Sequence, residues 1–379
     1  MALVLDDDQQ FIQDTARGFL AERAPISALR KLRDDRDATG FSRALWTEMA
    51  EMGWTGVLAP EAQGGAGLGF VAAGLIAEEM GRTLTASPYL TTALMAARAL
   101  TAAGSETQQA RWLPAIAGGT AVIALAVDET SKHRPAQTAL AATPQGNGFT
   151  LNGAKTFVAD LHVADQVIVA ARTTGAAGEE AGSTLFLVDP NAEGVGIERT
   201  IMTDSRNFGR LQLENVRVDG DAVLGGLDQG FRPLEMALDA GRVGLAAEMT
   251  GSAQECFGRT LDYLKERQQF GQAVGSFQAL QHRCAHLLCE IELAQSAVLK
   301  ALQALDAEDF MAPALVAVAK AKAGEAAQLA AREAIQMHGG VGMTDDVDIG
   351  FFIKRIQVAN EMLGDYAFHA DRIAALRGY

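Results

Sequence analysis

The loop HGGVG, at residues 338–342, is the most concentrated chemical signal in this chain of 379 residues. Glycine has no Cβ, so the backbone of such a loop can come close to a ligand. The loop is not a common nucleotide motif, because it follows a helical pattern rather than a strand and has no phosphate-binding lysine. By itself, the Gly339–Gly340 pair is typical of a helix C-cap followed by a turn, and His338 of a packed or capping histidine.

A second candidate is the segment KERQQFGQAVGSFQALQH, residues 265–282. Arg267 precedes Phe270 by three residues, and a new helix is predicted to begin near Ser276 with Gln278 in its first turn. An arginine beside the free N–H groups of a helix start can bind an anion. The alternative is a surface arginine at the end of a helix.

A third candidate combines two strand-like segments, LAVDET at 125–130 and KTFVAD at 155–160. Strands at the edge of a sheet could offer backbone N–H and C=O groups, together with an aromatic ring, to a flat heterocycle. Taken alone, this pattern is equally typical of ordinary β structure.

The apolar spacing that must position these segments changes along the chain. Residues 6–116 follow a helical spacing, interrupted by a glycine-rich loop at 56–70. Residues 121–223 switch to short runs rich in β-branched residues, where GNG at 146–148 and NG at 152–153 predict hairpin turns. The middle of the chain is therefore predicted to be a β domain.

Helical spacing returns after residue 230, and the last helical segment is predicted to break near Leu363–Gly364. Four long segments with short links are typical of an up-down bundle; they are 236–268, 277–306, 312–339 and 347–378. We therefore predict an α+β multidomain fold. Its parts are an N-terminal helical domain at 1–118, a middle antiparallel β domain at 119–226 and a C-terminal four-helix bundle at 227–379.

Composition limits the possible partners. The formal net charge of −15 argues against nucleic acid or an anionic membrane as a partner, although local arginines can still bind a phosphate-rich cofactor. The three cysteines have no metal-like spacing, which favours reduced thiols, a cytoplasmic location and no metal site. The start of the chain has no signal-peptide pattern, and no apolar run is long enough for a membrane span.

Taken together, the order of the three domains and the motifs R-x-x-F-G…Q and Q-x-H-G-G-x-G resemble the acyl-CoA dehydrogenase family of flavoproteins. The resemblance extends to MGWTGVLAPEAQGGAGLG at 52–69 and to LNGAKTFV at 151–158, and it covers nearly the whole chain. It implies an FAD cofactor, an acyl-CoA substrate and an electron-transfer flavoprotein as the oxidant. The family's reaction removes a proton from the carbon α to the thioester, and a hydride leaves the β carbon for flavin N5.

The resemblance also implies a role for each candidate residue. Arg267 would face the pyrophosphate of FAD, a charge-assisted contact. Such sites lie between subunits, so a homo-oligomer or a heterotetramer with a homologous subunit is expected. The remaining FAD contacts would be Gln336, Gly339 and Gly340 at the nucleotide end, Phe270 and Gln278 along the adenosine half, and Val127, Asp128, Phe157 and Val158 beside the isoalloxazine ring.

The sequence departs from the family at the proton-abstracting base. The usual glutamate position falls on Leu363, and the alternative position, just before Arg242, falls on Gly241. A base needs a carboxylate in hydrogen-bond reach of the α-proton, with a pKa raised by a dry pocket. Arg242 remains a candidate organiser of the acyl end, or alternatively a structural ion pair. The carboxylates that could serve as a displaced base are Glu361, Asp365 and Asp239.

Three hypotheses follow. The chain could be an acyl-CoA dehydrogenase with a displaced base, or the base-lacking subunit of a heteromeric enzyme, similar to the small-subunit type of pimeloyl- or steroid-side-chain-like dehydrogenases. It could also carry out other flavin chemistry, such as that of a monooxygenase, which needs no α-proton base. A non-catalytic FAD- or acyl-CoA-binding partner subunit is a further alternative. The retained cluster around Arg267 and Phe270 argues against a pure scaffold.

Overall fold

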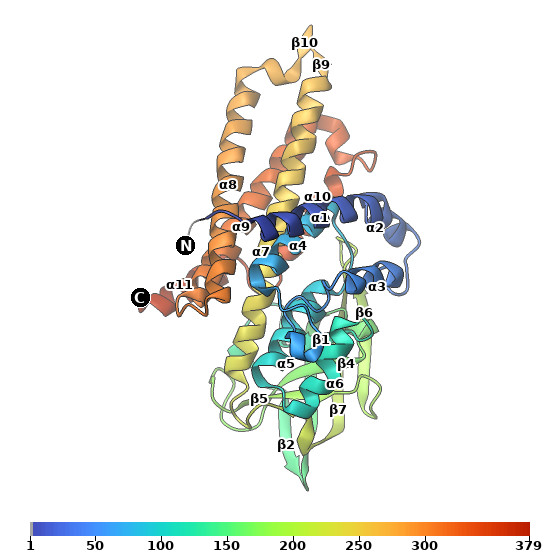
Figure 1. The fold of residues 1–379 in the computed structure, drawn as a ribbon, viewed down its shortest axis with the longest axis vertical. Helices are drawn as coiled ribbons and strands as arrows, with labels where there is room; N and C mark the ends of the chain where they lie inside the picture. Colours follow the sequence, from blue (N-terminus) through green and yellow to red (C-terminus); the bar gives the residue numbers. More distant parts are fainter. Residues whose placement is uncertain (1–2) are drawn as a thin grey trace. The chain divides into compact units, whose positions relative to one another are not determined.

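The structure is a computed structural model that describes residues 3–379. Along the sequence, helices precede and follow the strands of the β sheet, which confirms the predicted fold class (Figure 1). The described chain forms two compact units. One contains residues up to 31 together with 70–85 and 242–379, and the other contains 32–69 and 86–241. The N-terminal helices are thus shared between the two units.

The N-terminal helices begin at defined caps. Asp6 accepts a hydrogen bond from the N–H of Gln9 at 2.8 Å, and Ser105 accepts one from the N–H of Gln108 at 3.2 Å. Each cap satisfies an N–H group that the first helical turn leaves free. The helices are α1 (Asp7–Arg23), α2 (Ile26–Asp34), α3 (Arg43–Glu51), α4 (Gly69–Thr83), α5 (Ala97–Ala103) and α6 (Glu106–Ala117), with a π-helix, η2 (Tyr89–Ala96), before α5.

The C-terminal helices follow the predicted pattern closely. The predicted break is confirmed, because α10 and α11 are separated by residues 362–365, where Leu363 has φ 58° and Gly364 has φ 103°. A short hairpin, β9 (Gln268–Gln269) and β10 (Gln272–Ala273), joins α7 to α8 (Figure 1). The helices are α7 (Phe231–Glu266), α8 (Gln278–Asp306), α9 (Ala312–His338), α10 (Ile349–Glu361) and α11 (Tyr366–Arg377).

The eight-stranded sheet is mixed rather than wholly antiparallel. Most neighbouring strands pair antiparallel, as predicted, but β1 pairs β4 in parallel, and β2 meets β4 in parallel at one residue pair. One face of the sheet buries an apolar cluster that includes Leu151, Phe186 and Leu211. The strands are β1 (Ile123–Ala126), β2 (Ala141–Gln145), β3 (Gly148–Ala159), β4 (Gln166–Arg172), β5 (Ser183–Val188), β6 (Val195–Ile201), β7 (Asn207–Asp219) and β8 (Val223–Leu224).

One of the two predicted hairpin turns is present. Gly146 and Asn147 join β2 to β3, with Gln145 paired to Gly148. The turn predicted at Asn152–Gly153 is wrong, because both residues lie inside β3 at a shift in its pairing with β7. A Cβ on Gly153 would approach Leu140 at 2.9 Å, so glycine is needed there for close packing and a φ of 142° rather than for a chain reversal.

Two helices of the unit that holds the bundle cross at glycines. A Cβ on Gly81 of α4 would collide with the backbone carbonyl of Glu248 on α7, and one on Gly251 would collide with that of Glu78. The hydroxyl of Ser252 donates to the carbonyl of Gly81 at 2.9 Å. The absence of side chains thus allows the two backbones to approach closely.

Candidate functional site

The C-terminal end of α9 and the end of α7 lie together, as the candidate nucleotide site requires. The Tyr263 hydroxyl donates to the carbonyl of His338 at 3.2 Å, and the two rings stack with centroids 4.4 Å apart. Leu264, Cys284 and Met337 form the buried apolar cluster beneath them, which joins α7, α8 and α9. The segments that carry Arg267, Gln278 and Gln336 therefore approach one another through this cluster.

His338 has a structural role in this arrangement. Its side chain is buried, and its Nδ1 donates to the carbonyl of Ala334 at 2.7 Å. Burial lowers the pKa of His338, and the hydrogen bond to the Ala334 carbonyl opposes this shift. Gly339, with φ 65°, forms the C-cap of α9. The interpretation of this loop as a capped helix end with a packed histidine is confirmed.

The side chains around this helix end are exposed. Arg267, Gln278 and Gln336 all lie on the surface, and α8 begins without a side-chain cap at its N-terminus. A Cβ on Gly340 would meet nothing within 4 Å in the chain. Glycine at this position leaves space for the close approach of a group from outside the chain. An exposed cation, two amides and uncapped N–H groups suit the oxygens of a pyrophosphate.

The β9–β10 hairpin presents Phe270 at its turn. The ring is 91% exposed, and the residue has φ 54°, which is unfavourable for a side chain with a Cβ. Gly271 follows with φ 80°, so both turn residues are left-handed, as in a tight two-residue hairpin. An exposed aromatic ring held at such a position suits contact with another molecule.

The sheet-containing unit has a similar feature in β3. Phe157 has φ 52° and lies where the pairing of β3 with β7 shifts between Lys155 and Val158. Its ring is 52% exposed, whereas Val158 is buried in the sheet core. The bulge thus turns one aromatic ring outward beside a fixed backbone, an arrangement that suits a flat aromatic ligand.

The loop after β1 is fixed by ionic contacts. Lys155 is fully buried, and its Nζ donates to the carbonyl of Val127 at 2.9 Å and to Glu129 Oε1 at 2.7 Å. Asp128 contacts His133 Nδ1 at 2.8 Å. Burial lowers the pKa of Lys155, and the charge of Glu129 opposes this shift. The predicted residues Val127 and Asp128 are therefore held in one geometry next to Phe157, which lies two positions from Lys155.

Sequence reasoning overlooked Asp160, which follows the Phe157–Val158 segment. Its Oδ2 accepts a hydrogen bond from the Thr91 hydroxyl at 2.7 Å, and Thr91 lies in the π-helix η2. Burial raises the pKa of Asp160 to about 6, although Thr91 and the charge of Arg206 oppose this shift. Its position beside the aromatic residue could have indicated its importance, but nothing local in the sequence reports its desolvation.

The residues predicted for catalysis gather at the link between α10 and α11, residues 362–365. Arg242 is fully buried, and its Nε donates to the carbonyl of Leu363 at 3.4 Å. Asp365 caps α11 by accepting from the N–H of Phe368 at 2.9 Å. Glu361 is exposed and accepts from Gln357 Nε2 at 3.4 Å. Asp239, the third candidate base, is buried in the part of α7 that belongs to the sheet-containing unit.

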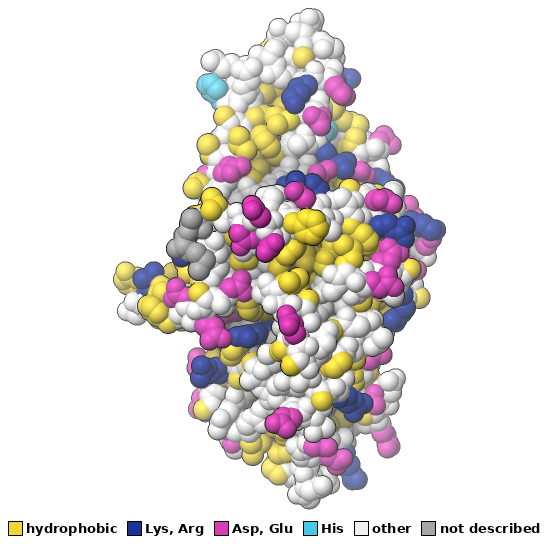
Figure 2. All heavy atoms as spheres, viewed as in Figure 1, with side chains coloured by type: hydrophobic (Ala, Val, Ile, Leu, Met, Phe, Trp, Pro, Cys, Tyr) yellow, Lys and Arg dark blue, Asp and Glu magenta, His cyan; other side chains and the backbone are white. Residues whose placement is uncertain are grey.

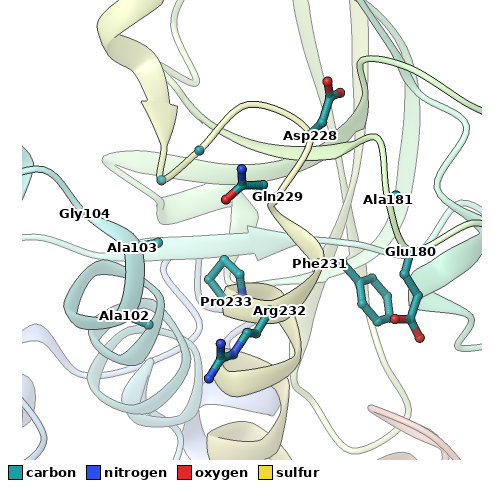
Figure 3. A pocket seen from close by; sticks show the side chains of 12 residues that line it. Ala102, Ala103, Gly104, Glu180, Ala181, Asp228, Gln229, Phe231, Arg232 and Pro233 are labelled. Atoms are coloured by element: carbon teal, nitrogen blue, oxygen red, sulfur yellow. The ribbon is translucent and has the colours of Figure 1, made fainter.

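A pocket of about 600 Å³ lies at the start of α7 in the sheet-containing unit (Figure 3). Its walls carry Glu180, Asp228 and Arg232. Asp228 accepts a hydrogen bond from the Thr173 hydroxyl at 2.6 Å. None of the residues predicted from the sequence lines this pocket, so it does not belong to the predicted FAD or acyl-CoA site.

The surface charges and the helices bear on the binding of nucleic acid, membranes and metals. On the face shown in Figure 2, Lys and Arg side chains are scattered among Asp and Glu rather than gathered in one basic area. Among residues 3–379, no helix is long and apolar enough to cross a membrane. Within the same described range, no group of three His, Cys, Asp or Glu side chains is arranged to hold a metal ion.

Comparison with known families settles the class of this protein. Models of the N-terminal, middle and C-terminal domains of acyl-CoA dehydrogenases match residues 6–120, 127–216 and 228–376. The chain belongs to the acyl-CoA dehydrogenase family. The resemblance to this family that was found in the sequence is thereby confirmed, and the family is one of oxidoreductases.

Individual members of the acyl-CoA dehydrogenase family are similar over most of their length. Acyl-CoA dehydrogenase FadE12 of Mycobacterium tuberculosis is 30% identical over 329 residues, which are 83% of this chain and 82% of the relative. A variant of the Tcur3481-Tcur3483 steroid ACAD superposes with a TM-score of 0.88 at 31% identity, over 98% of each chain. The ChsE4-ChsE5 complex of M. tuberculosis superposes with a TM-score of 0.89 at 26% sequence identity, over 100% of this chain and 99% of that chain.

Proposed function

We propose that this chain binds FAD and takes part in the α,β-desaturation of an acyl-CoA, as the base-lacking subunit of a heteromeric acyl-CoA dehydrogenase. The observation that carries the proposal is a contrast within the site residues. The side chains of Arg267, Phe270 and Phe157, which are expected to contact FAD, are exposed. Neither carboxylate near Leu363 is presented as a buried base, because Glu361 is exposed and Asp365 caps α11. A carboxylate needs a dry environment to accept an α-proton near neutral pH.

The FAD contacts are proposed in two groups, one in each compact unit. Phe157, with Val158 and the fixed loop at Val127 and Asp128, would border the isoalloxazine ring. Arg267 would neutralise the pyrophosphate of an FAD held by a neighbouring subunit, where Phe270 would lie along the adenosine half. The groups on this chain have the chemistry that the two ends of FAD require: a flat apolar contact and an exposed guanidinium.

Bound FAD would accept the hydride that leaves the β carbon of the acyl group. The chain's own residues orient the reactants and exclude water, while a homologous partner subunit supplies the carboxylate that accepts the α-proton. Two of the structurally similar proteins are named as pairs, Tcur3481-Tcur3483 and ChsE4-ChsE5, which supports such an assembly. An electron-transfer flavoprotein is proposed as the oxidant, and a steroid-linked or other bulky acyl group as the substrate.

FAD binding is tested first on the assembled protein. Replacing Arg267 by alanine removes a charge-assisted contact, so FAD affinity is expected to fall roughly 10- to 100-fold. Lys265 is the matched control, because it is an exposed cation two residues away whose partner is Asp262 at 3.7 Å. Lys265→Ala should retain flavin. Equal flavin retention by both variants, measured by absorbance after gel filtration, would refute the role of Arg267.

The heteromeric assembly is tested by co-expression with an adjacently encoded homologue. Co-purification in a fixed ratio, with more flavin bound than by the chain alone, is the expected result. A stable homo-oligomer that is fully loaded with FAD and ignores the homologue would contradict the assembly, while leaving the family and FAD binding intact.

A further inference from the structure

Lys320 of α9 is an unusual buried cation. Its side chain is 1% exposed, and its Nζ donates to two backbone carbonyls, those of Asn360 and Gly364, each at 3.1 Å. A buried charge is usually compensated by a carboxylate in direct contact. Asn360 lies in the last turn of α10, and Gly364 lies in the link between α10 and α11, which also carries Leu363.

Arg242 reaches the same link from α7. Its Nε donates to the carbonyl of Leu363 at 3.4 Å, and its guanidinium lies 5.4 Å from the centre of the Phe368 ring. We propose that Lys320 and Arg242 are positioning residues that clamp the 362–365 link through its carbonyl groups, and so fix the wall of the acyl site in this chain.

The link needs such a clamp because its backbone cannot stabilise itself. The last carbonyls of a helix have no partner within the helix, and a cation near them is favourable. Leu363 adopts φ 58°, a left-handed conformation that is unfavourable for a residue with a Cβ. Hydrogen bonds from the buried Lys320 and Arg242 satisfy carbonyls at this helix end and also hold Leu363 in its unfavourable conformation.

The packing of α9 against the end of α10 supports the same conclusion. A Cβ on Gly324, one turn beyond Lys320, would collide with the side-chain oxygen of Asn360. A Cβ on Gly364 would collide with the ring of Phe368. The glycine at 324 lets the end of α10 approach α9 and Lys320, whereas the glycine at 364 leaves space for the Phe368 ring of α11.

The charges around Lys320 are consistent with a structural amine. Burial is the main cause that lowers the pKa of Lys320 to about 7, Arg242 lowers it further, and Glu361 and Asp365 oppose the shift. A neutral amine still carries two N–H groups, so both carbonyl contacts persist in either protonation state. The clamp is therefore not a switch in the physiological range.

The consequence for substrate rests on the proposed function, since Leu363 occupies the position of the family's usual glutamate. With an apolar residue held rigidly there, the acyl group meets a fixed wall instead of a base. The clamp itself does not depend on that role, so the two ideas can fail separately.

Hydrogen–deuterium exchange of the assembled protein tests the clamp directly. Lys320→Met keeps the length and apolar stem of the side chain and removes its donors. Amides in peptides covering 362–369 are expected to exchange roughly tenfold faster, while those of β7 are unchanged. Lys322→Met is the matched control on the same helix, because Lys322 pairs with Glu290 on α8 and should leave residues 362–369 unaffected.

Two outcomes would overturn the clamp. One is a folded Lys320→Met protein in which residues 362–369 exchange as in the wild type, and the other is equal acceleration in Lys322→Met. If Lys320→Met does not fold, Arg242→Lys carries the test, because it keeps the charge but shortens the reach to the Leu363 carbonyl. The same local acceleration is expected, and unchanged exchange would contradict the clamp.

Acyl-CoA titration of the assembled protein provides the functional readout. The dissociation constant for a bulky acyl-CoA should rise about tenfold in Lys320→Met and recover in Lys320→Arg, with flavin content unchanged. Faster local exchange without a change in acyl-CoA affinity would confirm the clamp but show that residues 362–365 do not form part of the acyl site. If the wild type binds no acyl-CoA, the proposed function fails while the exchange result still decides the clamp.

Discussion

Lys155 and Lys320 are both fully buried lysines, one in each compact unit, and they are compensated differently. Lys155 contacts Glu129 at 2.7 Å as well as a carbonyl. Lys320 contacts two carbonyls, and the carboxylates of Glu361 and Asp365 act on it only through their charge. In both cases burial lowers the pKa, but only Lys155 retains a counter-charge in contact.

The difference indicates what each lysine is for. Lys155 and Glu129 form an ion pair that fixes a loop, and Glu129 also accepts from the N–H groups of Ala139 and Leu140. Removing either partner leaves a charge unpaired. Lys320 instead supplies donors to a backbone that lacks them, so its N–H groups matter more than its charge.

The largest expected effect is on the ion pair of the sheet-containing unit. Lys155→Met should lower the free energy of unfolding by about 3–5 kcal/mol, because it leaves the charge of Glu129 without its cation and the Val127 carbonyl without its donor. Urea denaturation of Lys155→Met, Glu129→Gln and the double variant measures the coupling between the two residues. Additive losses of unfolding free energy in the double variant would show that Lys155 and Glu129 are not coupled. The contrast drawn between Lys155 and Lys320 would then fail.

The second effect is a pH dependence specific to Lys320. Its pKa is about 7 in the folded chain and near 10.5 when unfolded, so the unfolded chain binds more protons between these values. Stability should therefore rise with pH from about 7 to 10.5, by up to a few kcal/mol at about 1.4 kcal/mol per unit.

Denaturation across this range compares the wild type with Lys320→Met, in which the slope should be absent. The charged and titratable groups around the link, Arg242, Glu361, Asp365 and His369, are the same in both proteins. An equal slope in the variant would mean that Lys320 is not the titrating group.

A third, smaller effect sharpens the comparison within the bundle unit. Burial raises the pKa of Glu78 to about 7, with Glu79 adding to the shift and Arg82, Gln254 and Gln295 opposing it. Because this pKa is raised on folding, the contribution of Glu78 to the free energy of unfolding is fully present below about pH 4.5 and declines as pH rises towards 7.

The pH window of Glu78 is narrower than that of Lys320, so the free energy of unfolding should fall by on the order of 3 kcal/mol across it. Glu78→Gln should abolish the decline between pH 4.5 and 7. If the decline persists in this variant, the loss of stability originates at another carboxylate.

The smallest effect on stability is expected at Phe157. Phe157→Gly removes the unfavourable left-handed backbone of a residue with a Cβ but adds entropy to the unfolded chain, so stability should change by less than about 1 kcal/mol. Flavin retention should nevertheless fall, because the outward ring is lost. Val158→Gly is the contrasting variant, since it empties a buried position of the same strand and should destabilise the protein.

Helical periodicity and turn residues carried much of the fold prediction. The break at Leu363–Gly364 and the turn at Gly146–Asn147 follow from local chemistry, which a sequence displays directly. The bulge at Gly153 and the parallel pairing of β1 with β4 depend on partners distant in sequence. No local pattern distinguishes these from a hairpin or an antiparallel pair.

The candidate site shows the same division. Motif spacing located Arg267, Phe270 and Phe157, whose exposure in the structure suits a ligand. It could not distinguish Lys320 from Lys322, which lie two residues apart in an alanine-rich helix, although only Lys320 is fully buried. Asp160 was missed for the same reason, since its desolvation results from packing beside Thr91 of η2.

The most direct test of the proposed function is anaerobic mixing of the protein with a panel of acyl-CoAs while the flavin absorbance is recorded. The proposal predicts no bleaching for the chain expressed alone, and bleaching by a bulky acyl-CoA once the homologous partner is present. Rapid bleaching of the chain alone, abolished by Glu361→Gln, would show a complete site in a homo-oligomer and contradict the heteromeric account.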